Sequence, residues 1–359
     1  MTVPVQPGTL AETRCTSFTP RTQTTRSPLS YAQVRHLTTN TESTTNSPPE
    51  EKGKPVKAAL PNIRLVIGDL DSSALLEAES ARADIVIHTA DASDNEPAAK
   101  AIAKGLASGH TKDNPGFWLH TGGAGILCWE TMRSEDALGE TSDRTYNDWT
   151  DVASLTHLPA SAFHKAIDDI VLSAGSDAVK TAILCPPTIY GRGRGPVHTR
   201  SRQAYELAHF ILARRCVPVV GRGAARWNNV HVADLARLFV LLVEAAVARR
   251  TDAELWNARG YYLVENGEHA WAELARRMGA TAVQLGLVEG GVGGLLEERR
   301  LSKDEALEQA GFEAVSWGYN SRGSAQRARE VLGWKPTAPC IEDTLEEILK
   351  DEQRRIEKK

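Results

Sequence analysis

Four glycine-rich segments of the chain have spacings that could hold a phosphate group. Thr121–Cys128 (TGGAGILC) follows a run of strand-forming residues and nearly matches the T-G-x-x-G-x-x-G turn, with Cys128 in place of the last glycine. In that turn, backbone N–H groups at a helix N-terminus bind a pyrophosphate. Of the other three segments, residues 191–195 lead into a proline, residues 290–294 lack a preceding strand, and residues 221–223 lie on a turn.

Thr121–Cys128 is predicted to end a later strand, and the phosphate loop is kept as the alternative. A dinucleotide-binding loop is followed by a helix and then by a second strand that ends in an acid. Here the next segment is Asp136–Leu155, which is polar and has no strand pattern. That leaves no glycine loop in the chain before Ile63.

A second group of reactive side chains lies further along, in Ser161-Ala-Phe-His164-Lys165. Histidine titrates near neutral pH and could exchange protons. On a helix, however, neighbouring side chains such as His164 and Lys165 point about 100° apart. An aliphatic hydroxyl such as that of Ser161 is too weak an acid to serve as a proton donor and acceptor at neutral pH.

Strand-like and helix-like segments that could position these residues alternate along the chain. β-branched and apolar runs predict buried parallel strands; they are Ile63–Ile67, Ile85–Ile87, Phe117–Thr121 and Thr181–Leu184. Helices are predicted from capping residues and apolar spacing; they are Asp71–Ala81 with Asp71 as N-cap, Glu96–Ala107, Pro159–Ala174, Arg202–Arg214, Val232–Ala248 and Thr344–Lys359. The alternation predicts an α/β fold with a doubly wound parallel sheet.

Composition excludes several classes of protein. The 359 residues, 41% hydrophobic and 25% charged, can form one large core and a smaller lobe. A net charge of −4 leaves no basic footprint for nucleic acid or for a membrane surface. The most apolar run, Leu238–Ala248, is too short to span a bilayer. Five scattered cysteines indicate a reducing, cytoplasmic environment and no structural metal site.

The first 49 residues differ in composition from the rest. They are rich in Thr, Ser and Pro and contain only two acids, Glu12 and Glu42. Residues 1–30 are expected to be disordered or aberrant in sequence, because nothing in them is typical of a central strand. Tyr31–Leu37 alternates weakly and is the first strand-like segment.

Six motifs together resemble the extended short-chain dehydrogenase/reductase family, the nucleotide-sugar epimerase-like proteins built on a Rossmann fold. In chain order they are IRLVIGDLD (63–71), DIVIHTA (84–90), FWLHTGGAGIL (117–127), AILCPPTIYG (182–191), RGAARWNNVHVAD (222–234) and AREVLGWKP (328–336). The resemblance extends from about Tyr31 to the C-terminus. It does not include the family's first strand and glycine loop, which are missing where they are expected.

The resemblance implies a division of the chain into four parts. Residues 31–185 correspond to the NAD(P)-binding core, 186–343 to a small substrate lobe that also completes the sheet, and 344–359 to a charged C-terminal helix, after the atypical residues 1–30. The cofactor implied is NAD or NADP. A homodimer is one assembly that the resemblance allows.

The family's catalytic Ser/Thr, Tyr and Lys are only partly present. Lys165 matches the family lysine, which lowers the pKa of the tyrosine and holds the ribose. The tyrosine position is Ser161, and the serine position is Gly123, so that Thr121 is the nearest hydroxyl. The resemblance therefore gives Lys165, Thr121 and Ser161 as the candidate catalytic residues.

Further site residues are implied by the resemblance. Those expected beside the cofactor are Asp69, Leu70, Thr89, Ala90, Lys165, Pro186, Thr188 and Ile189. Two of them have an alternative structural role: Asp69 could cap a loop, and Thr89 could be an ordinary hydroxyl at a strand end. Those expected beside the substrate are Tyr190, Arg226 and Trp227. Trp227 stands where nucleotide-sugar enzymes often place an arginine, which favours an uncharged or aromatic substrate, with packing in the lobe as the alternative.

Two functions follow. The first is an atypical NAD(P)-dependent oxidoreductase or epimerase that acts on a small molecule. The second is a non-catalytic dinucleotide- or metabolite-binding protein of the same fold, which the missing tyrosine, serine and glycine loop favour.

Overall fold

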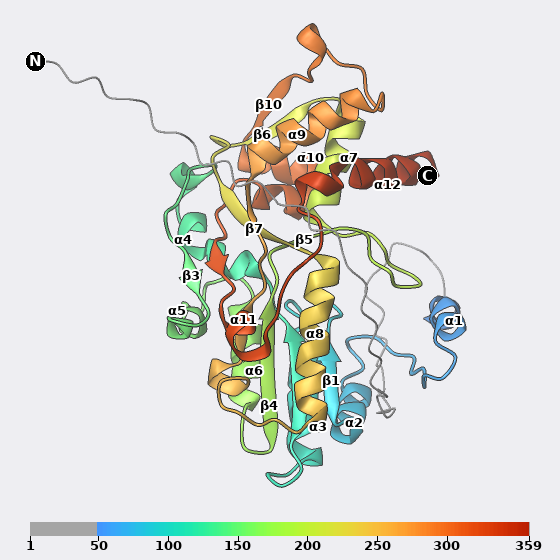
Figure 1. Ribbon diagram of the computed structural model, residues 1–359, viewed down its shortest axis with the longest axis vertical. Helices are drawn as coiled ribbons and strands as arrows, with labels where there is room; N and C mark the ends of the chain where they lie inside the picture. Colours follow the sequence, from blue (N-terminus) through green and yellow to red (C-terminus); the bar gives the residue numbers. More distant parts are fainter. Residues whose placement is uncertain (1–48, 359) are drawn as a thin grey trace, which may run out of the picture. The chain divides into compact units, whose positions relative to one another are not determined.

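The computed structural model describes residues 49–358, and a four-stranded parallel sheet lies at its centre (Figure 1). The strand order is β1-β2-β4-β8. The strands are β1 (Ile85–His88), β2 (Gly116–Thr121), β4 (Val179–Cys185) and β8 (Tyr261–Leu263). β2 and β4 are almost wholly buried, as their continuous apolar runs predict. The α/β fold with a parallel sheet is confirmed.

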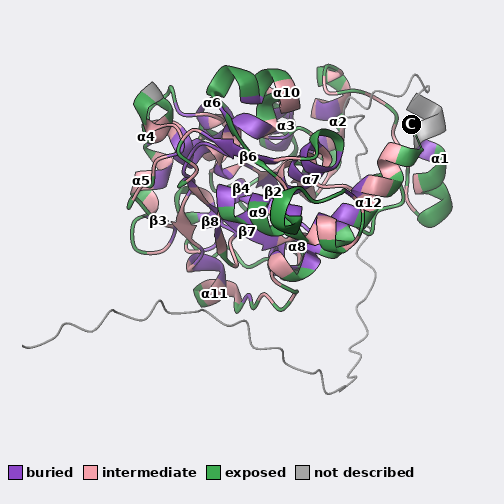
Figure 2. Cartoon of the chain, turned by 90° about the horizontal axis from the view of Figure 1, so that it is seen from above, coloured by how far each residue is buried: buried purple, intermediate pink, exposed green. Residues whose placement is uncertain are grey.

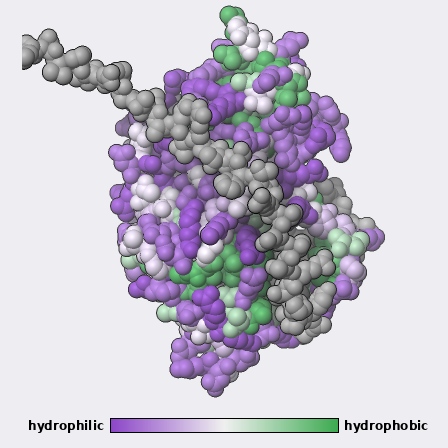
Figure 3. All heavy atoms as spheres, viewed as in Figure 1, coloured by the Kyte–Doolittle hydropathy of each residue, from purple (hydrophilic) through white to green (hydrophobic). Residues whose placement is uncertain are grey.

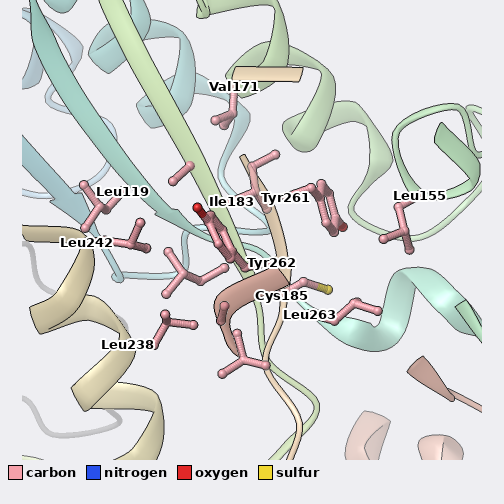
Figure 4. Close-up of a cluster of buried hydrophobic side chains, with 14 of the residues drawn as sticks. Leu119, Leu155, Val171, Ile183, Cys185, Leu238, Leu242, Tyr261, Tyr262 and Leu263 are labelled. Atoms are coloured by element: carbon pink, nitrogen blue, oxygen red, sulfur yellow. The ribbon is translucent and has the colours of Figure 1, made fainter. Parts of the chain in front are cut away.

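Helices cover both faces of this sheet. α3 (Glu96–Gly109) and α6 (Lys165–Ala174) lie on one face, and α8 (Val232–Val247) lies on the other (Figures 1 and 2). In Figure 4, Leu238 and Leu242 of α8 lie beside Leu119 of β2, on the side of the sheet away from Val171 of α6. Burial of each such side chain contributes about 1.5–3 kcal/mol, so both faces anchor the strands firmly.

α2 (Ser73–Arg82) packs closely against α3. Gly105 makes this approach possible, because a Cβ there would lie 2.3 Å from the carbonyl oxygen of Glu77. α3 begins as predicted, with Pro97 in its first turn and with the Asn95 side chain accepting a hydrogen bond from Ala98 N (2.9 Å).

A second core lies beyond the sheet and forms the lobe. Its helices are α7 (Gln203–Arg214), α9 (Trp271–Gln284), α10 (Lys303–Ser316) and α12 (Leu345–Glu357). They surround the parallel pair formed by β6 (Val217–Val220) and β10 (Glu298–Leu301). The predicted helices at 202–214, 232–248 and 344–359 are confirmed to within one or two residues at most ends.

Short elements connect the sheet and the lobe. A three-stranded sheet has the order β5-β7-β9, and β3 pairs with β11 in parallel. These strands are β5 (Thr188–Tyr190), β7 (Arg226–His231), β9 (Glu268–Ala270), β3 (Tyr146–Asn147) and β11 (Gly323–Ser324). The remaining helices are α1 (Pro49–Ala59), α4 (Trp129–Met132), α5 (Val152–Thr156) and α11 (Arg327–Leu332).

Three predictions about local structure are wrong. Ile63–Ile67 forms no strand, and Ile67 is 40% exposed. α2 begins at Ser73 with Ser72 as its N-cap residue, so Asp71 does not cap it. Pro159–His164 forms turns, and the helix begins only at Lys165. The predicted strand at Tyr31–Leu37 and the atypical residues 1–30 lie outside the described residues.

The face that carries α8 is mainly hydrophilic in Figure 3, with hydrophobic side chains in a patch in its lower half and in another group near its upper end. Val240 and Val247 of α8 are 44% and 50% exposed. Among residues 49–358, no helix is both long enough and apolar enough to cross a membrane.

Candidate functional site

The turn after β2 lies across the end of β4. Gly122 N donates to Leu184 O (2.7 Å), and Ala124 N donates to Pro186 O (3.0 Å). A 3₁₀ helix, Ala124–Cys128, follows at once, and the next strand of the same sheet is β4. This placement agrees with the prediction that Thr121–Cys128 ends a later strand, since no long helix follows to present its N-terminus to a phosphate.

Lys165 is the first residue of α6 and is buried. Its ammonium group pairs with the carboxylate of Asp169 one turn further along the helix. Asp168, on the same helix, is also buried. Its Oδ2 atom accepts a hydrogen bond from the hydroxyl of Tyr261 (2.8 Å). Its second oxygen, Oδ1, has no hydrogen-bond partner.

Burial raises the pKa of Asp168 to about 6, although the hydrogen bond from Tyr261 and the charges of His164 and Lys165 act in the opposite direction. Asp168 therefore ionises at a lower pH in the unfolded chain than in the folded one. The folded state binds the extra proton between these two pKa values, so this group lowers the stability of the protein as the pH rises from about 4 to about 6.

Asp168→Asn tests this sign. The amide still offers an oxygen to Tyr261 but cannot ionise. We expect the stability of the variant relative to wild type to rise between pH 4 and pH 7, by up to about 3 kcal/mol. Urea unfolding across this range measures the difference. A difference that stays constant with pH would contradict the raised pKa.

Ser161, the predicted counterpart of the family tyrosine, is exposed and lies in the turns before α6. A Y-x-x-x-K pair depends on helical spacing to bring its two side chains onto one face. Here Ser161 lies outside the helix that Lys165 begins, so that spacing does not apply.

His164 occupies the space next to the glycine turn. Its side chain is 8% exposed, and its Nδ1 lies 2.8 Å from Asp94 Oδ1. A Cβ added at Gly123 would lie 2.9 Å from His164 Nε2, closer than real side chains approach. The imidazole therefore fills the place that a serine at Gly123 would need.

Two further histidines, which the sequence reasoning missed, are buried at the ends of β1 and β2. The Nδ1 atoms of His88 and His120 lie 3.2 Å apart, and both Nε2 atoms lack a hydrogen-bond partner. Burial lowers the pKa of His88 to about 4 and that of His120 well below its usual value, so both are neutral at pH 7. The repeated His-Thr at the two strand ends, HTA and HTG, is the signal that could have revealed them.

The residues expected beside the cofactor fall into two groups. Pro186 and Thr188 are buried where the chain leaves β4, and Thr188 Oγ1 has no partner; Thr121 Oγ1 is also buried without one. Ile189 is half-buried.

The other group precedes and follows β1. Asp69 is exposed, and the Ser72 hydroxyl, which donates to its carboxylate (2.6 Å), lowers its pKa. Leu70 packs against the small apolar cluster of α2 and α3. Thr89 is exposed and Ala90 half-buried.

The residues expected beside the substrate belong to the three-stranded sheet β5-β7-β9 and its edges. Tyr190 is fully buried and donates its hydroxyl to Pro339 O (2.8 Å). Arg226 is paired with Glu268 (2.6 Å). Trp227 is 4% exposed and packs against Trp271 in the lobe core. The structure does not bring these three side chains into the group around Lys165.

No group of three or more His, Cys, Asp or Glu side chains within residues 49–358 could hold a metal ion. His231 and Asp234, in the motif at 222–234, have structural roles. The His231 ring accepts a hydrogen bond from Ala233 N at the start of α8. The Asp234 carboxylate accepts from Thr337 N and Ala338 N.

Comparison with known proteins gives matches in sequence and in structure. Residues 157–257 match the profile of the NAD dependent epimerase/dehydratase family. A protein described as oxidase ucsJ, from an Acremonium species, is 35% identical over 314 residues, which span 85% of this chain and 88% of that protein.

Solved structures share the fold. The dTDP-glucose 4,6-dehydratase DesIV from Streptomyces venezuelae, solved with NAD and TYD bound, has a TM-score of 0.57 at 16% identity, over 87% of this chain and 86% of its own. The UDP-glucose 4-epimerase from Thermotoga maritima, solved with UDP-glucose, has a TM-score of 0.52 at 15% identity, over 83% of this chain and 86% of its own.

Proposed function

The chain belongs to the NAD-dependent epimerase/dehydratase family, the extended short-chain dehydrogenase/reductases, and we propose that it is an atypical NAD(P)-dependent oxidoreductase or epimerase that acts on a small molecule. The observation that carries this proposal is the buried side chain of Lys165 at the start of α6, the helix that packs against β4. By its motif Lys165 matches the family lysine; its ammonium group pairs with Asp169, and ribose hydroxyls would give it further partners.

The residues at the carboxyl ends of the strands fit the nicotinamide and ribose half of such a cofactor. Thr121 Oγ1 and Thr188 Oγ1 are buried hydroxyl atoms without partners, and buried polar groups are rarely left so unless a ligand or water completes them. Lys165 would hold the ribose hydroxyls, and the segment Pro186–Ile189 would lie along the nicotinamide. When bound, the cofactor supplies hydride transfer.

An uncharged or aromatic substrate is supported by the groups near His164. The centroid of the Phe163 ring lies 3.9 Å from that of the His164 ring and 5.3 Å from that of the Phe312 ring. Phe312 is 50% exposed. Arg226, which adjoins the position where nucleotide-sugar enzymes often place an arginine, is already paired with Glu268. Aromatic rings and an engaged arginine suit a neutral molecule better than a nucleotide sugar.

A second candidate function is non-catalytic binding of a dinucleotide or metabolite. One observation favours it: Ser161, at the tyrosine position of the family, is exposed and outside α6. A protein of this kind would bind the cofactor without turning it over.

Thermal melting with each of NAD⁺, NADH, NADP⁺ and NADPH tests the proposal. A ligand at 100 times its Kd adds about 2.7 kcal/mol of stability, which raises the Tm by several degrees. We expect one dinucleotide pair to give this shift. A cooperative melt that none of the four shifts would contradict both the enzyme and the dinucleotide-binding alternative.

A further inference from the structure

His164 has an unusual backbone conformation for the residue that precedes a helix. Its φ of +66° lies in the left-handed region, which non-glycine residues seldom adopt. Such a conformation costs about 1–3 kcal/mol and persists only where the surroundings impose it. In this case it turns the imidazole away from the outer surface of α6 and toward the glycine turn that follows β2.

The two ring nitrogens of His164 face different partners. Nδ1 lies 2.8 Å from Asp94 Oδ1 and 3.2 Å from the carbonyl oxygen of Ser93, so it carries a proton and donates it to these acceptors. Nε2 faces the turn, 2.9 Å from an ideal Cβ at Gly123 and 3.3 Å from one at Gly125. Its lone pair is therefore directed at the place where family members carry the catalytic serine.

Asp94 can hold the ring in this orientation as a carboxylate. Partial burial would raise the pKa of Asp94, but the hydrogen bond and charge of His164, with Ser93 and Arg202, hold it below its usual value. In His–Asp pairs of this kind, the carboxylate fixes the tautomer and stabilises the imidazolium when the ring accepts a proton.

Other charged or titratable groups belong to the same network. His164 acts on Asp168 of α6 and on His120 of β2, Lys165 acts on Asp168, and Arg202, at the start of α7, acts on Asp94. His120 is neutral at pH 7 because burial lowers its pKa, so Asp94 is the acceptor that lies directly against the ring.

We propose that His164, oriented by Asp94, is the acid–base residue of this site in place of the family's tyrosine. The inference rests on the proposed oxidoreductase function. In the direction of alcohol oxidation, the substrate O–H bond breaks and its proton forms a bond with His164 Nε2. The C–H hydrogen leaves with its electron pair to the oxidised dinucleotide, and the C–O bond becomes a carbonyl. Reduction reverses both transfers.

The test combines melting with NMR spectroscopy of the full chain labelled with ¹⁵N-histidine. Long-range ¹H–¹⁵N spectra show which nitrogen of each imidazole carries the proton, and His164→Gln assigns the signal of His164. In the free protein we expect a proton on Nδ1 and none on Nε2. Asp94→Asn should move the proton to Nε2, because the amide can donate to Nδ1.

Addition of the dinucleotide that raises the Tm should shift the Nε2 signal of His164. The signal of His157, whose ring bonds to Ala153 O at the end of α5, serves as the control and should not move. A proton found on Nε2 of the free wild type would overturn the proposal. So would a dinucleotide that raises the Tm and leaves His164 Nε2 unchanged. If no dinucleotide binds, the proposed function fails, and the role of His164 fails with it.

Turnover gives a second readout, with acetophenone and cyclohexanone as uncharged probe ketones and the reduced dinucleotide as donor. For any probe that the wild type reduces, His164→Gln should lower kcat by about 10²- to 10⁴-fold and leave the Tm shift from the dinucleotide unchanged. His157→Gln, the same change at the exposed histidine that follows α5, should leave kcat unchanged. An unchanged kcat in His164→Gln would overturn the proposal, and if neither probe is reduced the NMR result decides alone.

Discussion

Asp148→Ala is expected to lower the free energy of unfolding by about 3–5 kcal/mol, because each buried hydrogen-bond donor that loses its acceptor costs about 1–3 kcal/mol. Asp148 is fully buried directly after β3. Its carboxylate accepts hydrogen bonds from the backbone N–H groups of Gln326 (2.8 Å), Arg327 (2.8 Å) and Leu263 (3.0 Å). Alanine would leave these three donors without acceptors.

The substitution would also remove a negative charge near the buried Arg327 guanidinium, which would keep its ion pair with Glu254 (3.3 Å). Three chain segments far apart in the sequence meet at Asp148, so the loss should affect the cooperative unfolding of the whole structure rather than one loop. Burial raises the pKa of Asp148 to about 6, so at pH 7.5 the carboxylate is ionised. Urea unfolding at this pH measures the effect.

Asp151→Ala is the matched control for Asp148→Ala. Asp151 is exposed and caps α5 through Ser154 N (3.4 Å), so its loss should cost only about 1 kcal/mol. Equal losses for the two variants would show that the carboxylate of Asp148 does not hold the three segments together.

The parts of the fold that the sequence predicts correctly are those with strong local signals. Phe117–Thr121 and Thr181–Leu184 are continuous apolar runs and form the two central strands. Pro97 marks the start of α3, because a proline suits the first turn of a helix whatever the tertiary contacts. In each case the local preference and the tertiary packing agree.

Ile63–Ile67 shows why a local signal can fail. Its β-branched residues suit a strand, but a strand exists only where a neighbouring strand pairs with it, and the pattern does not reveal whether a neighbour is present. Within residues 49–358, β1 has its single strand partner in β2, and residues 63–67 do not pair with it.

The candidate site was predicted in part. Lys165 was found because the family motif marks it, and the structure places it, buried, at the start of α6. His164 was set aside because helical spacing would point it about 100° away from Lys165. The helix instead begins at Lys165. The left-handed φ of His164, the residue before it, turns the imidazole toward the glycine turn after β2. Such a conformation depends on Asp94 and Gly123, which are distant in sequence, so local spacing could not reveal it.

Lys165→Met is expected to weaken dinucleotide binding by about 10- to 100-fold, because hydrogen bonds to a charged group contribute about 1.5–3 kcal/mol. Methionine has a similar length and packs well in apolar surroundings, so the fold should tolerate it. The partner that remains, Asp169, is 53% exposed and can be solvated. The stability of the free protein should therefore change little, while the Tm shift from the bound dinucleotide falls.

Lys180→Met controls for the loss of a lysine on the same sheet. Lys180 lies near the start of β4, at the end of the strand remote from the site, and its ammonium group contacts Ser176 O (3.0 Å). Its replacement should leave the Tm shift from the dinucleotide at the wild-type value. Titration of each variant with the dinucleotide that stabilises the wild type measures both affinities. Equal affinity of Lys165→Met and wild type would remove Lys165 from the cofactor site, whereas a loss confined to Lys165→Met would place the ribose beside the first turn of α6.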